Sequence, residues 1–337
     1  MMPAAAIVGL GQVAWKFDEE PGRKTIWTHL GAYKSTGRFG SIIAYDSDAA
    51  ACRSFAERHP DVTLVPSLET LVAQRCDAIS ICTPPDTHRS VLEAVLLGAP
   101  KVIWCEKPLA TSLADATWMV GACAERDIPL IVSHVRRWHR RWRRFRERIA
   151  TGDIGTVRCL RIAMPNRLWS IGSHGIDLLL WIGGPIAEMR ALELPAAAQG
   201  GEPACAALLR FASGVLGIFQ VTGLKEKFVV EAEAIGDRGR LVLSESRGTV
   251  RLERFERSKR YEGYEELAEA FDDAVPGGHD DSASPFSAIA MEVLALLAEP
   301  HRAPTCSGRD ALETQRALAK MAAGGRASMT GERGIIA

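Results

Sequence analysis

The chain has 337 residues, 47% of them hydrophobic, which is enough for two domains with substantial cores. Lysine plus arginine and aspartate plus glutamate both number 41, and the zero net charge argues against bulk binding to nucleic acid or anionic membranes. No apolar run reaches the roughly 20 residues needed to cross a bilayer. The eight cysteines form no C-x-x-C pair and no metal-type cluster with histidine, so we expect a reduced, cytoplasmic protein without a metal.

The first predicted element is an apolar strand that begins at Ala4 and ends in a glycine motif. The motif fits the dinucleotide-binding pattern G-x-G-x-x-A. Its first glycine permits a tight turn, its second admits a pyrophosphate, and its small last residue lets helix and strand pack closely. We therefore predict cofactor contacts at Gly9, Gly11, Gln12 and Val13.

A second predicted strand, residues 41–45, ends in Asp46. An acidic residue there would bind the ribose hydroxyls and repel a 2′-phosphate, which favours NAD over NADP; the alternative is an ordinary surface turn. Asp46 follows Ala14 by 32 residues, where about 20 are usual. The surplus lies around residues 15–24, and it is either a lid near the cofactor or a solvated insertion.

Helices and strands alternate through the rest of the first 132 residues. The predicted helices cover residues 50–58, 67–74, 89–98 and 112–125, and the predicted strands cover residues 62–65, 78–82, 102–104 and 130–132. This rhythm is typical of the α/β class with a doubly wound parallel sheet. We assign residues 1–132 to this domain and residues 133–337 to a second one.

Glu106-Lys107-Pro108 directly follows the predicted strand at residues 102–104. Open α/β sheets bind ligands at the carboxyl ends of their strands. Proline restricts the backbone of the residue before it, so Lys107 is held where it can face a ligand. The alternative is a surface lysine at a strand end.

The order of these motifs resembles the glucose–fructose oxidoreductase / inositol dehydrogenase (Gfo/Idh/MocA) family. The resemblance rests on the glycine motif, Asp46, the turn at residues 83–88 and Glu106-Lys107-Pro108. It also rests on segments at residues 150–157, 171–181 and 306–312 that are similar to segments of the family. The resemblance implies an N-terminal Rossmann domain and a C-terminal α/β domain with a large, mostly antiparallel, open-faced sheet. It also implies hydride transfer between NAD and a hydroxyl or keto carbon of a sugar, cyclitol or nucleotide-linked sugar.

The resemblance assigns roles to residues of the first domain. It places Lys107 beside the nicotinamide and the reacting carbon–oxygen group. It places Thr83, Pro84, His88 and Glu106 around the cofactor.

His174 is the candidate acid/base of the second domain. A histidine with its ordinary pKa near 6.5 suits proton transfer at neutral pH. Gly172-Ser173 predicts a helix start with Ser173 as its N-cap, and a helix N-terminus would disfavour the protonated ring. The alternative is a histidine that only completes a helix start.

The resemblance is incomplete before this helix, because Ser170 stands where the family often has aspartate. Support from Ser170 or Asp177, or altered catalysis, therefore stays open.

Eight arginines in residues 136–148 accompany an apolar helical stripe, which predicts an amphipathic helix with a solvated basic face. Alternatively, Arg136 or Arg137 binds an anionic substrate group. The remaining predicted substrate contacts are Asn166 and Trp169.

The second domain is predicted to contain strands at residues 206–211, 215–221, 228–235, 240–243 and 250–255. One face of this sheet would be available to a partner, so we expect a homodimer or homotetramer. The acidic segment 261–281 is expected to be an exposed excursion before a helix at residues 286–298.

Two other functions stay open: a non-catalytic NAD- or sugar-binding regulator, and an NAD-dependent hydrolase or lyase of the same family.

Overall fold

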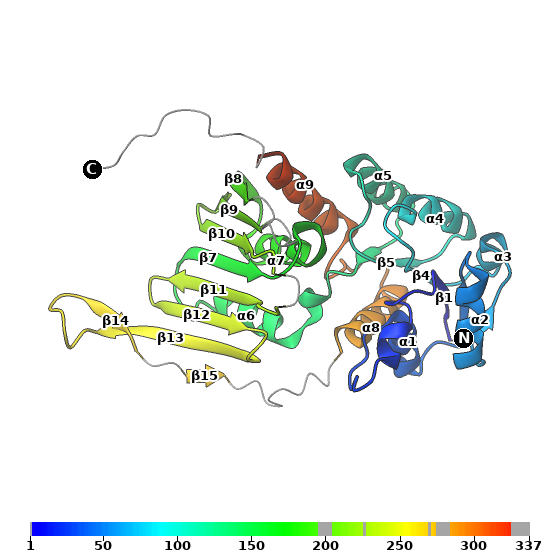
Figure 1. The fold of residues 1–337 in the computed structure, drawn as a ribbon, viewed down its shortest axis with the longest axis horizontal. Coiled ribbons are helices and arrows are strands. Elements are labelled where there is room, and N and C mark those ends of the chain that lie inside the picture. The colour runs from blue at the N-terminus through cyan, green and yellow to red at the C-terminus, as the bar shows by residue number, and fades with distance from the viewer. Residues whose placement is uncertain (1, 195–203, 225–226, 269–270, 274–283, 325–337) are drawn as a thin grey trace. The chain divides into compact units, whose positions relative to one another are not determined.

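The computed structural model describes residues 2–194, 204–224, 227–268, 271–273 and 284–324. The chain forms two compact units, Met1–Arg144 with Ala274–Gln315 and Phe145–Asp273 with Arg316–Ala337. These units do not coincide with the division at residues 132 and 133, because α8 (Pro285–Ala298) returns to pack against the first unit. The predicted boundary between functional domains stays a prediction. The elements of both units are labelled in Figure 1.

The first unit contains a six-stranded parallel sheet. In spatial order its strands are β3 (Thr63–Leu64), β2 (Ser41–Tyr45), β1 (Ala4–Val8), β4 (Ala78–Ile81), β5 (Val102–Cys105) and β6 (Leu130–Val132). Every neighbouring pair is parallel, and the direction of chain progression reverses between β1 and β4. The predicted doubly wound sheet is confirmed, and its switch point is where such sheets bind ligands.

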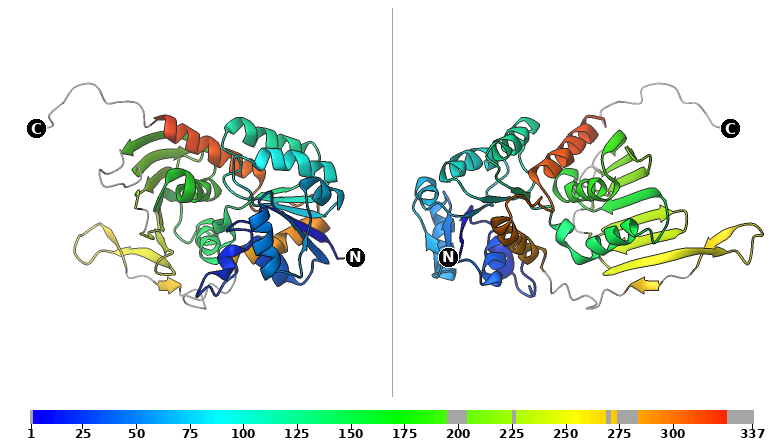
Figure 2. Two further views of the ribbon diagram at one scale, coloured as in Figure 1. Left: turned by 45° about the vertical axis from the view of Figure 1, so that its right-hand side comes forward. Right: turned by 180° about the vertical axis from the view of Figure 1, so that it is seen from behind.

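Helices cover both faces of this sheet. They are η1 (Lys16–Glu19), α1 (His29–Thr36), α2 (Ala49–Arg58), α3 (Leu68–Ala73), α4 (His88–Val95), η2 (Leu96–Gly98), α5 (Leu113–Ala124), η3 (Val135–Trp138) and α8. Figure 2 shows α1 and α8 on one face, and α4 and α5 on the other. Side-chain caps begin several of these helices, as the Thr28 hydroxyl does for α1 by accepting from Gly31 N.

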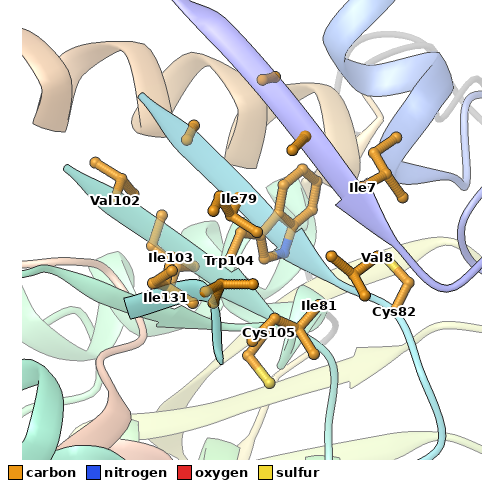
Figure 3. Packing of buried hydrophobic residues seen from close by; sticks show 14 of the residues in the cluster. Ile7, Val8, Ile79, Ile81, Cys82, Val102, Ile103, Trp104, Cys105 and Ile131 are labelled. Carbon is orange, nitrogen blue, oxygen red and sulfur yellow. The ribbon is translucent and has the colours of Figure 1, made fainter. Parts of the chain in front are cut away.

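The centre of the parallel sheet is buried on both sides. Every residue of β4 and β5 is buried, as expected of strands covered by helices on both faces. Figure 3 shows these side chains packed together around Trp104. Trp104 is fully buried, and its indole Nε1 donates to the Ser133 hydroxyl at 2.8 Å, which satisfies its polar atom.

The surplus after the glycine motif is a loop between the glycine turn and the start of α1 at His29. His29 N donates to Val13 O, and Leu30 N donates to Ala14 O, both at 3.0 Å. These partners are sixteen residues apart where an ordinary helix has four, so twelve residues are looped out between consecutive turns. Trp15 is buried in this loop, and its Nε1 donates to Leu10 O at 2.9 Å, so the segment is a packed part of the unit.

The second unit contains a nine-stranded sheet. In spatial order its strands are β14 (Glu265–Leu267), β13 (Thr249–Arg257), β12 (Gly239–Ser244), β11 (Glu231–Gly236), β7 (Val157–Met164), β10 (Leu216–Val221), β9 (Ala204–Phe211) and β8 (Ile186–Leu194), with β15 (Phe271–Asp273) also paired to β13. Within the described residues, β7 and β10 form the one parallel pair. The mostly antiparallel sheet is therefore confirmed.

The acidic segment before α8 was predicted wrongly in part. Residues 265–267 and 271–273 of this segment are strands β14 and β15 on the edge of the sheet, where an excursion was expected. The sequences of β14 and β15 do not alternate between apolar and polar residues. At the edge of a sheet a strand can be held by backbone pairing, without a buried row of side chains. Residues 269–270 and 274–281 of the segment lie outside the described residues.

The second unit also contains helices. They are the second half of α6 (Arg140–Ala150), η4 (Leu168–Gly172), α7 (Ser173–Gly183) and the last turns of α9 (Gly308–Gly324). Helix α7 packs on β7 and β10, and Figure 2 shows it in front of the sheet in the right-hand view. Gly175 permits this approach, since a Cβ there would lie 2.5 Å from Phe219. None of the described helices is long and apolar enough to cross a membrane.

The arginine-rich segment is not one solvated helix. His139 is extended (φ −70°, ψ 128°) and separates η3 from α6. Two of the arginines, Arg137 and Arg141, are only 2% and 4% exposed. Trp138 is buried as expected, but its Nε1 donates to Glu292 Oε2 of α8 at 2.6 Å. The predicted basic face is wrong at these positions, because part of it is turned inward against residues distant in sequence.

Candidate active site

The glycine motif forms the turn between β1 and the loop that follows. Gly9 has φ +92°, and a Cβ on it would lie 2.7 Å from the backbone of Cys82 and Thr83, so only glycine fits there. Gly11 differs, because a Cβ on it would meet nothing within 4 Å. Gly9 therefore lets the turn lie against the end of β4, while Gly11 borders open space of the kind a phosphate group needs.

Asp46 is fixed next to this turn. Its Oδ2 accepts from Leu10 N at 2.6 Å, and its Oδ1 accepts from Asp48 N at 2.8 Å. The carboxylate thus ties the end of β2 to the glycine turn. It is placed as a ribose-binding acid is placed in dinucleotide-binding folds.

A cavity of about 760 Å³ opens between these elements, within the usual range for a small-molecule site. Five residues predicted to contact the cofactor line it: Gly9, Gly11, Asp46, Thr83 and Pro84. Its other lining residues are Val8, Leu10, Lys16, Tyr45, Ser47, Asp48, Ala51, Leu68, Cys82, Thr87, Ser90 and Val91. Gln12 and Val13 follow Gly11 on the same turn but are not part of this lining.

Lys16 is the one lysine or arginine of this lining, and the sequence patterns did not point to it. It lies on the looped-out segment, which no dinucleotide motif covers. Its Nζ lies 5.7 Å from the centroid of the Trp15 ring, and within the described residues it forms no ion pair with a carboxylate. The only available signal was its position immediately after the glycine motif.

The turn after β4 contains a buried, unsatisfied polar group beside the lining of the cavity. The Thr83 Oγ1 atom is buried and has no hydrogen-bond partner within the described part of the chain. Such an atom is costly unless a ligand satisfies it. His88 stands behind this turn, with its Nε2 at 2.8 Å from Thr83 O and its Nδ1 at 3.1 Å from Leu109 O. His88 therefore supports the wall of the cavity from inside the protein.

These observations together test whether a dinucleotide fits. The space at Gly11 and the fixed carboxylate of Asp46 suit the phosphate and ribose portions of such a molecule. Among the described residues, no three histidine, cysteine, aspartate or glutamate side chains are arranged to hold a metal ion.

Glu106 and Lys107 follow β5 at the same edge of the sheet. Glu106 is 8% exposed, its Oε1 lies 3.0 Å from His29 Nε2, and its Oε2 accepts from Lys107 N at 3.3 Å. Burial would raise the pKa of Glu106, but its hydrogen bonds with His29 and Ser133 outweigh burial and hold that pKa below its ordinary value.

Lys107 is half-buried, and the bond between it and Pro108 is cis. Burial lowers the pKa of Lys107 below its ordinary value. The Glu106 carboxylate opposes this shift, and the Arg136 guanidinium adds to it. Lys107 is therefore closer to exchanging a proton at neutral pH than a surface lysine is.

The helix predicted to start at Gly172-Ser173 is α7, which begins at Ser173, but the prediction of Ser173 as its N-cap was wrong. Residues 168–172 form a π-helical turn, η4, that runs directly into α7. Gly172 is the N-cap without a side-chain cap bond, and the Ser173 hydroxyl instead donates to Ser170 O at 2.7 Å. Because the π turn runs directly into α7, His174 does not lie at a free helix N-terminus, where the helix dipole acts most strongly. Such turns recur at functional sites.

The candidate residues of the second unit lie on or before α7. His174 is 4% exposed, and Asp177 is fully buried three residues later on the same helix. Asn166 has a left-handed backbone (φ +64°), and its N donates to Leu224 O at 3.3 Å. Trp169 is 44% exposed in η4. Their roles, and the pairing of His174 with Lys107 of the first unit, stay predictions.

Arg137 makes contacts within the first unit. Its Nη1 lies 3.2 Å from Asp310 Oδ1 and donates to Thr305 O at 3.0 Å. This ion pair, between the buried Arg137 and the partly exposed Asp310, ties η3 to the start of α9. A substrate role for Arg136 or Arg137 remains a prediction.

Two models of one family match the chain. The NAD-binding Rossmann fold of the GFO/IDH/MocA oxidoreductase family matches residues 5–134, and the GFO/IDH/MocA C-terminal domain matches residues 166–242. The chain belongs to the GFO/IDH/MocA oxidoreductase family, and its first unit contains an NAD-binding Rossmann domain. The resemblance drawn from the sequence motifs is confirmed.

Individual relatives are more distant. Myo-inositol dehydrogenase Hyg17 of Streptomyces leeuwenhoekii is 28% identical over 223 residues, which are 59% of this chain and 68% of that protein. D-apiose dehydrogenase of Paraburkholderia graminis is 24% identical over 209 residues, which are 56% of each chain. The fold is shared with an oxidoreductase from Agrobacterium radiobacter, whose structure was solved in complex with NAD+, L-tartaric acid and magnesium. That structure has a TM-score of 0.77 and 18% identity, with 97% of each chain covered.

Proposed function

We propose that this protein is an NAD-dependent dehydrogenase or reductase that acts on a hydroxyl or keto carbon of a sugar, cyclitol or nucleotide-linked sugar. The observation that carries the proposal is the cavity bordered by Gly11, Asp46 and Thr83, together with Glu106 and Lys107, which directly follow β5 in the same parallel sheet. The names of the two relatives, a myo-inositol dehydrogenase and a D-apiose dehydrogenase, support the substrate class. Asp46 supports NAD over NADP.

Lys107 is proposed to bind the reacting oxygen. When bound, NAD accepts a hydride from the substrate carbon or delivers one to it. In the oxidative direction the hydroxyl loses its proton, and an ammonium group beside it stabilises the developing negative charge. The lowered pKa of Lys107 supports a share in the proton transfer as well.

His174 is proposed as the group that takes up or returns this proton. Ser170 cannot supply the charge of a carboxylate, so Asp177 is the remaining acid of α7 that could support the histidine. Arg136, Arg137, Asn166 and Trp169 are proposed substrate contacts.

Turnover of a substrate panel tests this proposal. Purified protein with NAD is assayed for NADH formation on inositols, aldoses and nucleotide sugars. We expect Lys107→Ala and His174→Ala each to lose about 10²- to 10⁴-fold in kcat/KM, as removal of a general acid or base does. Lys101→Ala and His301→Ala are exposed controls that retain wild-type activity. A loss below tenfold in both Lys107→Ala and His174→Ala would contradict the assigned roles.

The altered position Ser170 favours a second candidate, a regulator that binds NAD or a sugar without turnover. Calorimetry that shows NAD binding, together with no product from any panel member, would support it. A hydrolase or lyase that returns NAD unchanged would instead release product with substoichiometric cofactor and no net NADH.

We also propose a homodimer or homotetramer formed through the uncovered face of the second sheet. Leu192, Leu208 and Leu216 are 58%, 57% and 45% exposed on neighbouring strands of that face, among charged side chains.

A cytoplasmic location is supported by the eight cysteines, all in described residues, since none forms a disulfide.

A further inference from the structure

His29 is a buried titratable residue beneath the candidate site, and the proposed chemistry does not use it. It is the first residue of α1, directly after the looped-out segment, and it is fully buried. Its ring stacks on Trp104 with a centroid distance of 3.7 Å. Its Nε2 lies 3.0 Å from Glu106 Oε1, and its Nδ1 lies 2.9 Å from Ser80 Oγ. With both nitrogens engaged and no exposure, His29 cannot reach a substrate.

The hydrogen bonds around His29 have one consistent direction. An ionised Glu106 can only accept, so His29 donates from Nε2. In the neutral ring Nδ1 then accepts from the Ser80 hydroxyl, and the Ser80 oxygen accepts from Tyr33 Oη at 2.8 Å. Burial raises the pKa of Tyr33 and lowers that of His29, so the phenol keeps its proton and the ring stays neutral.

The network therefore holds a single buried negative charge, on Glu106. Ser133, which accepts from Trp104 Nε1, also hydrogen-bonds to this carboxylate. The neighbouring thiols of Cys82 and Cys105 stay neutral, because burial raises their pKa well above the ordinary value. The positive groups facing the site are Lys107, which is next in sequence, and Arg136 of η3, which acts on Lys107.

We propose that His29 is a positioning residue, which keeps Glu106 ionised and fixed beside Lys107 and thereby sets the charge and orientation of that lysine. The inference rests on the proposed role of Lys107 for its catalytic meaning. A buried carboxylate without such donors takes up a proton more readily. Without the donor from His29, Lys107 loses the charge that opposes its deprotonation.

Direct titration of Lys107 tests this without any substrate. Reductive methylation of the full-length protein with ¹³C-formaldehyde labels its lysines, and NMR follows their titration. The Lys107 signal is identified by its absence in Lys107→Arg. We expect the pKa of Lys107 to fall by about one unit in His29→Leu, since an opposite charge within about 6 Å shifts a pKa by one unit or more.

Three further variants make the test specific. His29→Gln retains an amide N–H for Glu106 and should restore part of the shift. Tyr33→Phe disturbs only the far end of the network and should leave the Lys107 titration unchanged. Glu106→Gln keeps the shape of the carboxylate and removes its charge, so it should lower the pKa of Lys107 as His29→Leu does, even where His29→Leu folds poorly.

Kinetics add a second readout. With the best substrate of the panel, His29→Leu should reduce kcat about tenfold and move the lysine-dependent limb of the pH–rate profile to lower pH, with KM for NAD within about twofold. An unchanged Lys107 titration in folded His29→Leu would overturn the inference even where Glu106→Gln lowers the pKa of Lys107, and an unchanged titration in Glu106→Gln would overturn it where His29→Leu does not fold. Full activity of Lys107→Ala would instead overturn the proposed function, and the two failures are distinguishable.

Discussion

The two sheets of this protein differ in how much of their surface is buried. Every residue of β4 and β5 in the parallel sheet is buried, whereas β11 in the second sheet alternates between buried and half-buried residues. Helices cover both faces of the first sheet, so polar groups inside it are paired internally, as His29 is with Glu106. The second sheet has an outward face on which leucines and charged residues remain accessible. Substitutions should therefore act on stability in the first sheet and on assembly in the second.

The largest expected effect is on the core of the parallel sheet. Trp104→Ala should lower the free energy of unfolding by about 3–5 kcal/mol, because it leaves a cavity and removes the donor to Ser133. Urea denaturation followed by circular dichroism measures this. Leu97→Ala is the matched control, since Leu97 is 83% exposed in the same unit. Equal stability of the two variants would contradict a core centred on Trp104.

A smaller effect on stability is expected at the ion pair between Arg137 and Asp310 in the first unit. Asp310→Asn should cost about 1–2 kcal/mol at pH 7, because the Arg137 guanidinium is 3% exposed while Asp310 is partly exposed to solvent. Burial opposes the ionised form of Asp310, but Arg137 and Ser307 outweigh it and hold its pKa below the ordinary 3.8.

The pH dependence of this pair has a definite sign. Because the folded pKa of Asp310 is lowered, its contribution is complete above pH 3.8 and is lost as the pH falls through the folded value. Wild type and Asp310→Asn should therefore differ in unfolding free energy at pH 7 and converge as the pH falls through the folded pKa of Asp310. Glu262→Gln, an exposed change in the second unit, should show no such difference. A gap between wild type and Asp310→Asn that does not narrow as the pH falls below 3.8 would rule out the ion pair as its source.

The next effect concerns the cofactor cavity. Lys16→Met should weaken binding of 5′-ADP about tenfold and leave adenosine binding unchanged, because the ammonium would contact the diphosphate. Lys24→Met lies on the same segment but is exposed, and it should bind both molecules as wild type does. Calorimetry at low and high salt measures these affinities. Equal losses for 5′-ADP and adenosine would mean that Lys16 shapes the cavity rather than binding phosphate.

The smallest effect on stability is expected on the open face of the second sheet. Leu208→Glu should change the free energy of unfolding by less than about 0.5 kcal/mol, because the side chain is 57% exposed. The same change should dissociate an assembly formed through this face, as seen by light scattering. Leu97→Glu provides a control in the first unit at an even more exposed position. An unchanged molar mass for Leu208→Glu would exclude this face as the interface.

Local patterns predicted much of this architecture. The alternation of strands and helices before residue 132 and the turn at Gly9 follow from short-range periodicity and backbone geometry, and the structure confirms both. Asp46 was identified because its position is fixed relative to a strand end. The same reasoning failed at β14 and β15, whose acidic residues show no periodicity because backbone pairing to β13 defines them.

Other features depend on contacts that no local pattern contains. His29 and Glu106 are 77 residues apart, and their hydrogen bond arises only once α1 lies against β5. The inward turn of Arg137 depends on Asp310, far along the chain. In the π turn before His174 the backbone hydrogen bonds span five residues, where an ordinary α-helix has four. A capping pattern such as Gly172-Ser173 cannot distinguish the two.

The looped-out segment has a consequence for how this protein can vary. Two bonds, from His29 N to Val13 O and from Leu30 N to Ala14 O, join the ends of the segment, so changes confined to its exposed residues should leave α1 in place on the sheet. The rest of the segment is restricted by the buried Trp15 and by Asp18, which accepts from Trp27 N and from the Thr28 hydroxyl. Its exposed tip, residues 19–24, offers a place to attach a fluorophore that would report cofactor binding while leaving the sheet untouched.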